Sequence, residues 1–223
     1  MSGETIGLFG PAPSGPATLY PGALAGYTLG MVREALDFSQ ATTTMYGKAF
    51  PVPRLEAWYG LNPYRYGGQE QQPKPWPALL HEVCSDVELA MFNRKEVGLT
   101  TATEIAAAMP RFDSCFANLY RNGQDTIGWH ADDDDWMGPL IASVSFGTAR
   151  DFVMRRKDDH SIKHVFSLGH GDLLVMPPGT QDEWEHHVPR RKRVGGVRIN
   201  LTFRQTRGPH PPVKGFQGRG VAP

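Results

Sequence analysis

The chain has 223 residues, of which 40% are hydrophobic and 21% charged, as expected for one soluble globular domain. The 23 basic and 23 acidic residues cancel, so net charge does not decide whether the partner is a nucleic acid. No apolar stretch approaches the roughly 18 residues that span a bilayer, and no basic segment followed by an apolar run opens the sequence. We therefore expect a cytoplasmic, monomeric protein without a membrane span, with Cys84 and Cys115 as reduced thiols.

The N-terminal half is predicted to carry helices between less regular segments. Residues 1–16 are rich in Gly, Pro and Ser and are expected to form a flexible arm. Apolar residues recur at helical spacing in 20–39 and again in 76–92, which predicts two helices. Residues 93–110 are interpreted as a surface insertion with a short helix of its own.

The C-terminal half has the pattern of a β-rich domain. From Asp113 onward, short runs of β-branched and aromatic residues alternate with turn residues. The runs that predict strands are 115–120, 141–146, 151–155, 164–168, 172–176 and 197–204. Short strands at such intervals predict an α+β domain over 17–207, with a jelly-roll (double-stranded β-helix) core and the N-terminal helices packed outside. Residues 208–223 are expected to be a flexible tail.

Charged residues are segregated along the chain. Four consecutive aspartates occupy 132–135, whereas basic runs occupy 155–157 and 190–193. Any one such run is explained by a solvated loop. Basic loops around an acidic metal site can also form a local positive rim.

The segment 129–132, Trp-His-Ala-Asp, is the sharpest local feature. In an extended segment, residues two apart point to the same face, so His130 and Asp132 can bind one ion together. A third ligand is available downstream at His186 or His187. Two histidines and one carboxylate form the facial triad of non-haem iron(II) oxygenases, although a zinc hydrolase can use the same three residues.

The segment 198–204 alternates polar and apolar residues without a break. On a strand, the polar residues share one face and the apolar residues the other. The polar residues are Arg198, Asn200, Thr202 and Arg204. This face can simply lie in water, but two arginine forks inside a barrel beside a metal can hold both ends of a dicarboxylate. The combination of this strand with the His-x-Asp motif is far more specific than either part.

Together these motifs resemble the AlkB family of nucleic-acid dealkylases. The resemblance rests on His130-x-Asp132, a distant histidine, and Arg198-x-Asn200-x-Thr202-x-Arg204 in the same order. Further segments are similar to the DNA-repair branch of the family: 52–54, 64–68, 73–76, 141–147 and 150–152. The resemblance implies an Fe(II)-, O2- and 2-oxoglutarate-dependent dioxygenase that removes methyl groups of the 1-methyladenine or 3-methylcytosine type from DNA, releasing formaldehyde, succinate and CO2.

The resemblance also implies which residues hold the metal and the co-substrate. His130, Asp132 and His186 would hold iron, because the family ligand follows a tryptophan by two residues, here Trp184. His187, which faces the opposite way on a strand, would pack or lie toward the substrate. The distal carboxylate of 2-oxoglutarate would bind Arg198, Asn200 and Tyr120, and the carboxylate beside the keto group would bind Arg204 and Asn118.

For the substrate, the resemblance implies a nucleotide-recognition lid over about 45–75. Tyr64 and Tyr66 lie in this lid, and Tyr66 would stack on a flipped base with His130 opposite. Tyr46 stands where a wedge would fill the vacated stack, or it is an ordinary surface aromatic. 

The acidic and basic runs acquire roles under the same resemblance. Asp134 would face the base edge, and Asp133 would support the loop or Arg150, although the four aspartates leave open which one meets the base. The basic run 190–193 would bind phosphates, which fixes position without reading sequence.

Three alternatives stay open at this point. The same enzyme class can act on RNA, a protein side chain or a small molecule. The fold can serve as a non-catalytic nucleic-acid-binding module, although the intact triad and both arginines speak against that. A zinc hydrolase using His130, Asp132 and His186 is the third, and it leaves the arginine strand without a role.

Overall fold

The computed structural model describes residues 15–45, 48–66, 69–92, 101, 103 and 109–207. Most of the predicted arm (1–16), Tyr46, most of the predicted insertion (93–110) and the whole predicted tail (208–223) lie outside these residues. Within the described part of the chain, no helix has the length and apolar character needed to cross a membrane.

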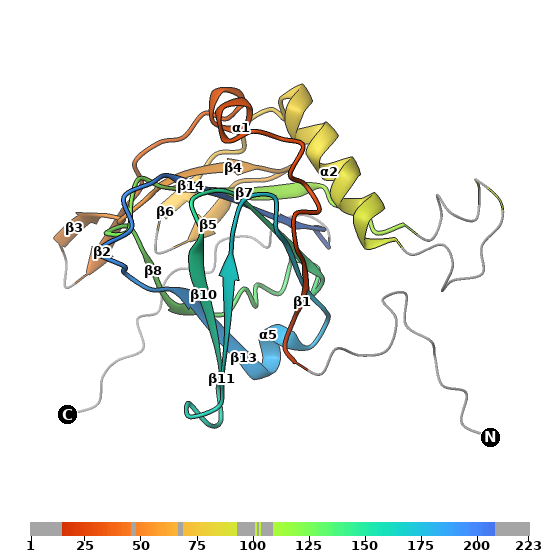
Figure 1. Cartoon of the computed structure of the whole chain (residues 1–223). Coiled ribbons are helices and arrows are strands. Elements are labelled where there is room, and N and C mark those ends of the chain that lie inside the picture. The colour runs from red at the N-terminus through yellow and green to blue at the C-terminus, as the bar shows by residue number, and fades with distance from the viewer. Residues whose placement is uncertain are drawn as a thin grey trace, which may run out of the picture.

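Two antiparallel sheets form the body of the protein (Figure 1). The six-stranded sheet has the order β1 (Thr18–Tyr20), β12 (Leu173–Met176), β9 (Ile141–Gly147), β14 (Arg198–Arg204), β7 (Ser114–Tyr120), β4 (Leu55–Tyr59). The four-stranded sheet has the order β11 (Lys163–Leu168), β10 (Arg150–Arg156), β13 (Trp184–Val188), β8 (Ile127–His130). This arrangement is consistent with the predicted jelly roll, and each of the six predicted strands is present with shifts of one residue at some ends.

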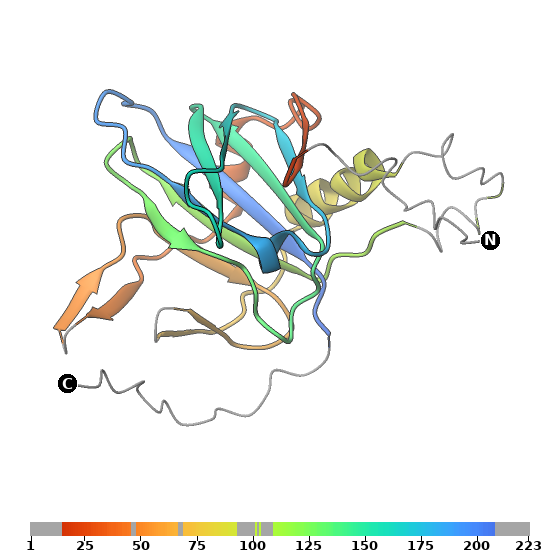
Figure 2. The same cartoon turned by 90° about the horizontal axis from the view of Figure 1, so that it is seen from below.

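Two hairpins and two longer helices complete the fold. The hairpin of β2 (Thr42–Met45) and β3 (Lys48–Pro51) projects from the body, and that of β5 (Tyr64–Tyr66) and β6 (Gln69–Gln71) lies on the same side (Figure 2). Helices α1 (Leu29–Ala35) and α2 (Ala78–Met91) cover the outer face of the six-stranded sheet, and a four-residue helix, α5 (Thr180–Glu183), precedes β13.

The alternating pattern of β14 decides which face of the large sheet meets the helices. Ile199, Leu201 and Phe203 are at most 1% exposed and pack in one cluster with Val83 and Val87 of α2. Burial of such side chains contributes about 1.5–3 kcal/mol each. The polar residues of β14 consequently face the space between the two sheets, where the candidate site lies.

The helix predicted over 20–39 is much shorter than expected. Gly22 adopts a left-handed backbone with φ of 63°, and Leu24 N–H donates to the carbonyl of Gly171. Both features hold the segment before α1 as turns, so the helix begins only after Thr28, whose Oγ1 accepts from Met31 N–H. The predicted helix over 76–92 is confirmed as α2.

Both cysteines are free and buried, which confirms the expectation of thiols. Burial, with the Glu88 carboxylate beside it, raises the pKa of Cys84 to about 12. Burial likewise holds the pKa of Cys115 well above its usual range. Neither thiol is therefore ionised at neutral pH.

Gly147 and Gly179 share a left-handed backbone conformation but differ in the space around them. Gly147 and Gly179 both have φ of 90°, but a Cβ on Gly147 would lie 2.4 Å from the carbonyl oxygen of Val197, whereas one on Gly179 would meet nothing within 4 Å. We expect Gly179→Ala to lower the free energy of unfolding by about 1–2 kcal/mol through backbone strain alone. Gly147→Ala should lower it clearly further, as measured by urea denaturation; equal losses would contradict the tight contact.

Candidate active site

The predicted metal ligands come together at one end of the space between the sheets. Strands β8 and β13 pair so that His130 lies directly opposite His186. Nε2 of His130 lies 3.6 Å from Oδ1 of Asp132, and Nε2 of His186 lies 3.9 Å from Oδ2. One ligand atom from each of the three residues lies within 4.8 Å of the others. This is the donor set of a facial triad, which leaves coordination positions open on one side.

Hydrogen bonding and burial prepare both histidines as ligands. Nδ1 of His130 lies 2.8 Å from the carbonyl oxygen of Gly128. Because a carbonyl only accepts, Nδ1 carries the proton and the Nε2 lone pair faces Asp132. Burial lowers the pKa of His186 to about 3, so this imidazole is neutral, as a metal ligand must be.

Asp132 lies in the loop after β8 and is held there by α5. Its backbone N–H donates to Oε1 of Gln181 at 2.9 Å. Burial raises the pKa of Asp132, but its electrostatic interactions with His186, His130 and Arg204 lower it more, so the net pKa lies below the usual value. The carboxylate is therefore ionised, as metal binding requires.

Gln181 was not found from the sequence, and its role can be tested. We expect Gln181→Ala to weaken iron(II) binding by about 10- to 100-fold, the usual cost of losing an outer-sphere partner. Titration of the full chain with iron(II) under anaerobic conditions measures this change. Unchanged affinity would show that the loop after β8 holds Asp132 without Gln181.

The choice of His186 over His187 agrees with the geometry. His187 points to the other side of β13 and stacks on Trp129, with ring centroids 3.8 Å apart. The guanidinium of Arg155 lies 3.9 Å from the centre of the Trp129 ring. His187 therefore packs on the outer face of the small sheet, on the side opposite the ligands.

A pocket between the two sheets adjoins the triad. It encloses about 690 Å³, including space open to solvent, and its lining includes the three ligands. Asn118 and Tyr120 of β7 lie directly opposite Asn200 and Arg198 of β14 in the sheet register. Four of the five residues predicted to bind 2-oxoglutarate are thus neighbours on two adjacent strands, and the fifth, Arg204, lies at the other end of β14.

The two arginines of β14 occupy different places. Arg204 lines the pocket, with Nη2 donating to the Gly138 carbonyl at 3.3 Å. Arg198 is 1% exposed and is not among the lining residues; it donates to Ser145 Oγ, and its guanidinium lies 5.3 Å from the centre of the Tyr120 ring. Arg198 is thus buried beside Tyr120, which lines the pocket. 

Buried donors in both arginines have no hydrogen-bond partner among the described residues: Nε and Nη1 of Arg198 and Nε of Arg204. A buried charged donor without a hydrogen-bond partner lowers the stability of the folded protein. Such donors fit an anionic ligand, and the two imidazole nitrogens with the Asp132 carboxylate fit a divalent metal ion. The residues present therefore fit both iron(II) and a dicarboxylate co-substrate.

Among the predicted substrate residues, Tyr64 lines the pocket, and Asp134 contacts Tyr64 and Arg204, which both line it. Tyr64 Oη donates to Oδ2 of Asp134 at 3.0 Å, and Nη1 of Arg204 lies 3.7 Å from the same oxygen. Burial and the Asp134 carboxylate hold the pKa of Tyr64 well above its usual range, so its hydroxyl remains a donor. Asp134 is thus connected to the pocket through Tyr64 and Arg204.

The other predicted substrate residues are less constrained. Asp133 is exposed and pairs with Lys157 at 3.5 Å. The expected contact in which Asp133 supports Arg150 is not found among the described residues. Arg150 instead donates to the backbone carbonyls of Asn122, Asp125 and Pro189. Tyr66 belongs to β5, but the position of its side chain lies outside the described part of the structure, as does Tyr46.

Two aromatic residues of the site carried no predicted role. Phe152 stacks on His186 with ring centroids 4.9 Å apart, and Trp58 stacks on Tyr64 at the same distance. Phe152 belongs to a segment that contributed to the family resemblance, which was the only signal for it. Trp58 lies in β4, a strand that the sequence pattern did not reveal.

The profile of the 2OG-Fe(II) oxygenase superfamily matches residues 23–204. The chain therefore belongs to this superfamily, whose members are defined by iron(II) and 2-oxoglutarate. Within it, the resemblance to AlkB-like dioxygenases is confirmed by relatives. "Alpha-ketoglutarate-dependent dioxygenase alkB homolog 3" of Homo sapiens is 35% identical over 201 residues, which cover 83% of this chain and 64% of that protein.

Other comparisons agree with this assignment. "DNA oxidative demethylase ALKBH2" of Bos taurus is 38% identical over 177 residues, covering 74% of this chain and 57% of that protein. The chain thus spans less than two thirds of the length of these relatives. A solved structure described as OsALKBH1 has the same fold, with a TM-score of 0.59, 18% identity, and coverage of 85% of this chain and 98% of that one.

Proposed function

We propose that the protein is an Fe(II)- and 2-oxoglutarate-dependent oxidative demethylase of N-alkylated bases in DNA, such as 1-methyladenine and 3-methylcytosine. The observation that carries the proposal is the triad of His130, Asp132 and His186 opening onto a pocket that Arg204 lines. Individual buried donors of Arg204 and Arg198 on β14 have no hydrogen-bond partner among the described residues. A zinc hydrolase has no use for such donors. The names of the relatives support a base in DNA as the substrate.

In this proposal the chain binds and orients the reactants. Arg204 and Asn118 hold the carboxylate beside the keto group, and Arg198, Asn200 and Tyr120 hold the distal carboxylate. Iron and 2-oxoglutarate, when bound, would activate O2, one atom of which would hydroxylate the N-methyl carbon while the other enters succinate; formaldehyde, succinate and CO2 would be the products besides the repaired base. The two sheets exclude bulk water from the pocket, and Asp134 with Tyr64 presents polar groups to the incoming base.

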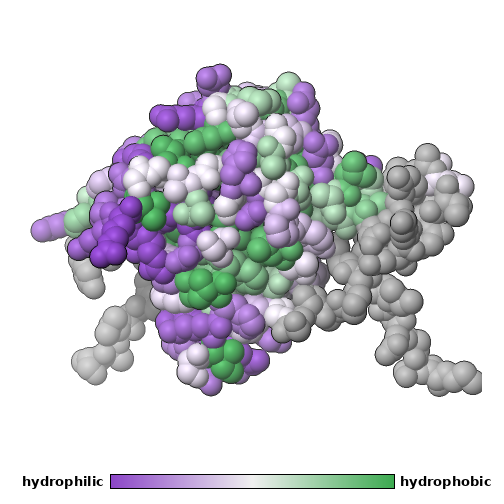
Figure 3. All heavy atoms as spheres, in the orientation of Figure 1, coloured by the Kyte–Doolittle hydropathy of each residue, from purple (hydrophilic) through white to green (hydrophobic). Residues whose placement is uncertain are grey.

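The nucleic acid would approach the side that carries both hairpins. Residues 45–75 serve as the lid, Tyr66 stacks on the flipped base, Tyr46 fills the vacated position, and Asp133 supports the loop. Residues 190–193 are exposed, and hydrophilic side chains gather over the region of β2, β3 and the loop after β13 (Figure 3). The cations of 155–157 are each paired with a carboxylate, whereas in 190–193 only Arg191 has a carboxylate partner among the described residues, Asp151, which favours this loop as the phosphate contact.

One experiment tests the reaction directly. The full chain is reconstituted anaerobically with iron(II) and 2-oxoglutarate, and oxygen is then added with an oligonucleotide carrying one 1-methyladenine or 3-methylcytosine. We expect the oligonucleotide to lose the mass of one methylene unit, in parallel with succinate formation. His130→Ala should abolish both signals.

The other outcomes separate the alternatives. Succinate without demethylation of DNA, but with demethylation of a matching RNA, would make the protein an RNA-directed enzyme of the same class. Oligonucleotide binding without succinate would support a non-catalytic binding module. A protein that retains zinc, forms no succinate and hydrolyses a test ester would support the hydrolase.

A further inference from the structure

A buried ion pair lies in the wall of the pocket, on β4 and the residue before it. Nη2 of Arg54 lies 2.5 Å from Oε1 of Glu56, and the two residues are 3% and 1% exposed. Removing two charges from water costs several kcal/mol each, so a buried pair is weak evidence for stability. A role in the neighbouring site is the more informative explanation.

Arg54 determines how the amide of Asn118 is oriented. Nε of Arg54 donates to Oδ1 of Asn118 at 2.8 Å. Because its oxygen accepts this hydrogen bond, the Nδ2 hydrogens of Asn118 are the groups available to donate to a ligand. Asn118 lines the pocket and lies directly opposite Asn200 in the sheet register. A carboxylate can only accept hydrogen bonds, so this amide orientation suits a carboxylate ligand, and the reverse orientation would present oxygen to oxygen.

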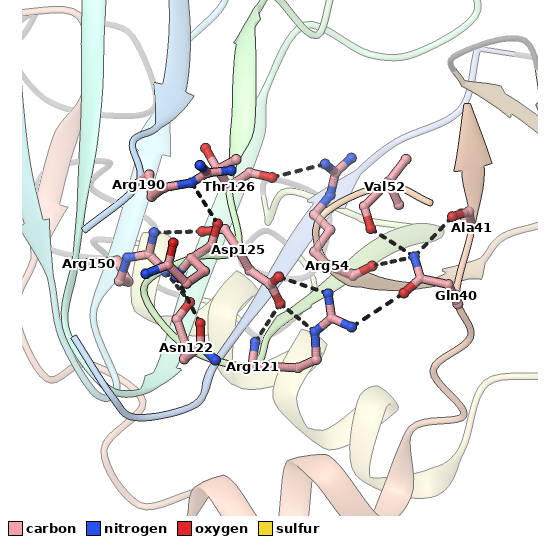
Figure 4. A network of polar contacts seen from close by, with 11 residues as sticks. Gln40, Ala41, Val52, Arg54, Arg121, Asn122, Asp125, Thr126, Arg150 and Arg190 are labelled. Atoms are coloured by element: carbon pink, nitrogen blue, oxygen red, sulfur yellow. Dashed lines mark hydrogen bonds and ion pairs between the residues drawn. The ribbon is translucent and has the colours of Figure 1, made fainter. Parts of the chain in front are cut away.

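The arginine itself is held at several points. Its Nη1 donates to the carbonyl of Thr126 at 3.3 Å, and its own carbonyl accepts from Nε2 of Gln40 at 3.2 Å (Figure 4). Thr126 N–H donates in turn to the Pro53 carbonyl. The guanidinium is therefore fixed relative to β7 and β8, which carry Asn118 and the ligand His130.

The same ion pair connects the pocket with the β5–β6 hairpin. The second oxygen of Glu56, Oε2, accepts from Nε2 of Gln71 at 2.7 Å, and Gln71 is the last residue of β6. Arg54, Glu56 and Gln71 also line a second pocket, of about 840 Å³ including open solvent, which shares Arg54 and Ile127 with the first. A continuous series of polar contacts thus runs from the hairpin to the co-substrate pocket.

We propose that Arg54 is a positioning residue for 2-oxoglutarate: it orients the Asn118 amide toward the carboxylate, and Gln71 through Glu56 makes that orientation depend on the docked β5–β6 hairpin. Arg54 acts through Asn118 and needs no contact with the co-substrate. This inference rests on the proposed co-substrate site and not on the identity of the methylated substrate.

The test measures co-substrate binding without turnover. The full chain is loaded with manganese(II), and its affinity for 2-oxoglutarate is measured by calorimetry. We expect Arg54→Lys, which keeps the charge but lacks the fork, to weaken 2-oxoglutarate binding on the order of tenfold while manganese affinity stays unchanged. Hydrogen exchange adds a second readout: 2-oxoglutarate should slow exchange across Gln69–Gln71 in the parent protein and not in Arg54→Lys.

Arg121→Lys is the matched control. Arg121 forms a similar fork to Asp125, donates to Gln40 Oε1, and lines neither pocket (Figure 4). Its substitution should leave 2-oxoglutarate affinity unchanged. Equal affinity in Arg54→Lys and the parent protein, or equal losses in both arginine variants, would overturn the inference.

A second variant covers the case in which Arg54→Lys does not fold. Gln71 is half-buried, and Gln71→Leu conserves its size while removing the hydrogen bond to Glu56. We expect this variant to lose the exchange protection of β6 on addition of 2-oxoglutarate; retained protection would overturn the link to the hairpin. If the parent protein itself fails to bind 2-oxoglutarate, the co-substrate site is wrong, whereas binding without DNA demethylation leaves this inference standing.

Discussion

Asp132→Ala is expected to abolish both iron(II) binding at stoichiometric concentration and succinate formation. Asp132 supplies the only carboxylate of the described triad, and its two oxygens lie 3.6 Å and 3.9 Å from the two histidine nitrogens. Its loss leaves the imidazoles of His130 and His186 as the remaining triad ligands, and burial lowers the pKa of His186 to about 3. The loss of affinity should therefore exceed the roughly 10- to 100-fold expected when an outer-sphere partner such as Gln181 is removed.

Asp133→Ala is the matched control, because Asp133 is the adjacent carboxylate but faces Lys157 at the surface. We expect this variant to bind iron(II) and form succinate like the parent protein. Metal content by mass spectrometry and succinate by chromatography measure both quantities. Normal iron binding and turnover in Asp132→Ala would show that another group completes the metal site.

The strands that could be predicted are those whose side chains alternate or form long apolar runs. The polar and apolar residues of β14 alternate over seven residues, and β9 is buried along nearly its whole length. The residue types alone did not predict strand β13, although its burial alternates, because its inward positions include His186; only the family resemblance led us to treat His186 and His187 as strand residues. Strand β4 was missed because it is short and contains Glu56, whose burial depends on Arg54.

The helix predicted over 20–39 shows the limit of local periodicity. Its apolar spacing is helical, yet Leu24 pairs through its backbone with Gly171 and packs in the sheet core. A tertiary contact thus overrides the local pattern. Only the stretch after the Thr28 cap retains the predicted helix.

The candidate site could be predicted as far as its chemistry is carried by side-chain type and short spacing. The triad and the residues of β14 met both conditions. Gln181 and Arg54 did not, because each acts through a residue far away in the chain, 49 positions from Asp132 and 64 positions from Asn118. Only the fold brings them together.

Arg204→Leu is expected to weaken 2-oxoglutarate binding by about 10- to 100-fold. The Arg204 guanidinium is 5% exposed, lines the pocket, and has an Nε donor without a partner among the described residues. Hydrogen bonds to charged groups contribute about 1.5–3 kcal/mol, which corresponds to a loss of this size. Leucine conserves much of the packing volume, so the measured change reports mainly the lost charge and donors. Calorimetry on the manganese-loaded chain gives the affinity.

Two comparisons distinguish this effect from a general loss of structure. Arg191→Leu removes an equal charge from an exposed arginine that pairs with Asp151, and it should leave 2-oxoglutarate affinity unchanged. Succinate, the shorter dicarboxylate without the keto group, should bind the parent protein weakly and should lose less affinity on Arg204→Leu, because Arg204 is assigned to the carboxylate beside the keto group. Equal losses for both ligands would instead place Arg204 at the distal carboxylate and exchange the roles assigned to the two arginines of β14.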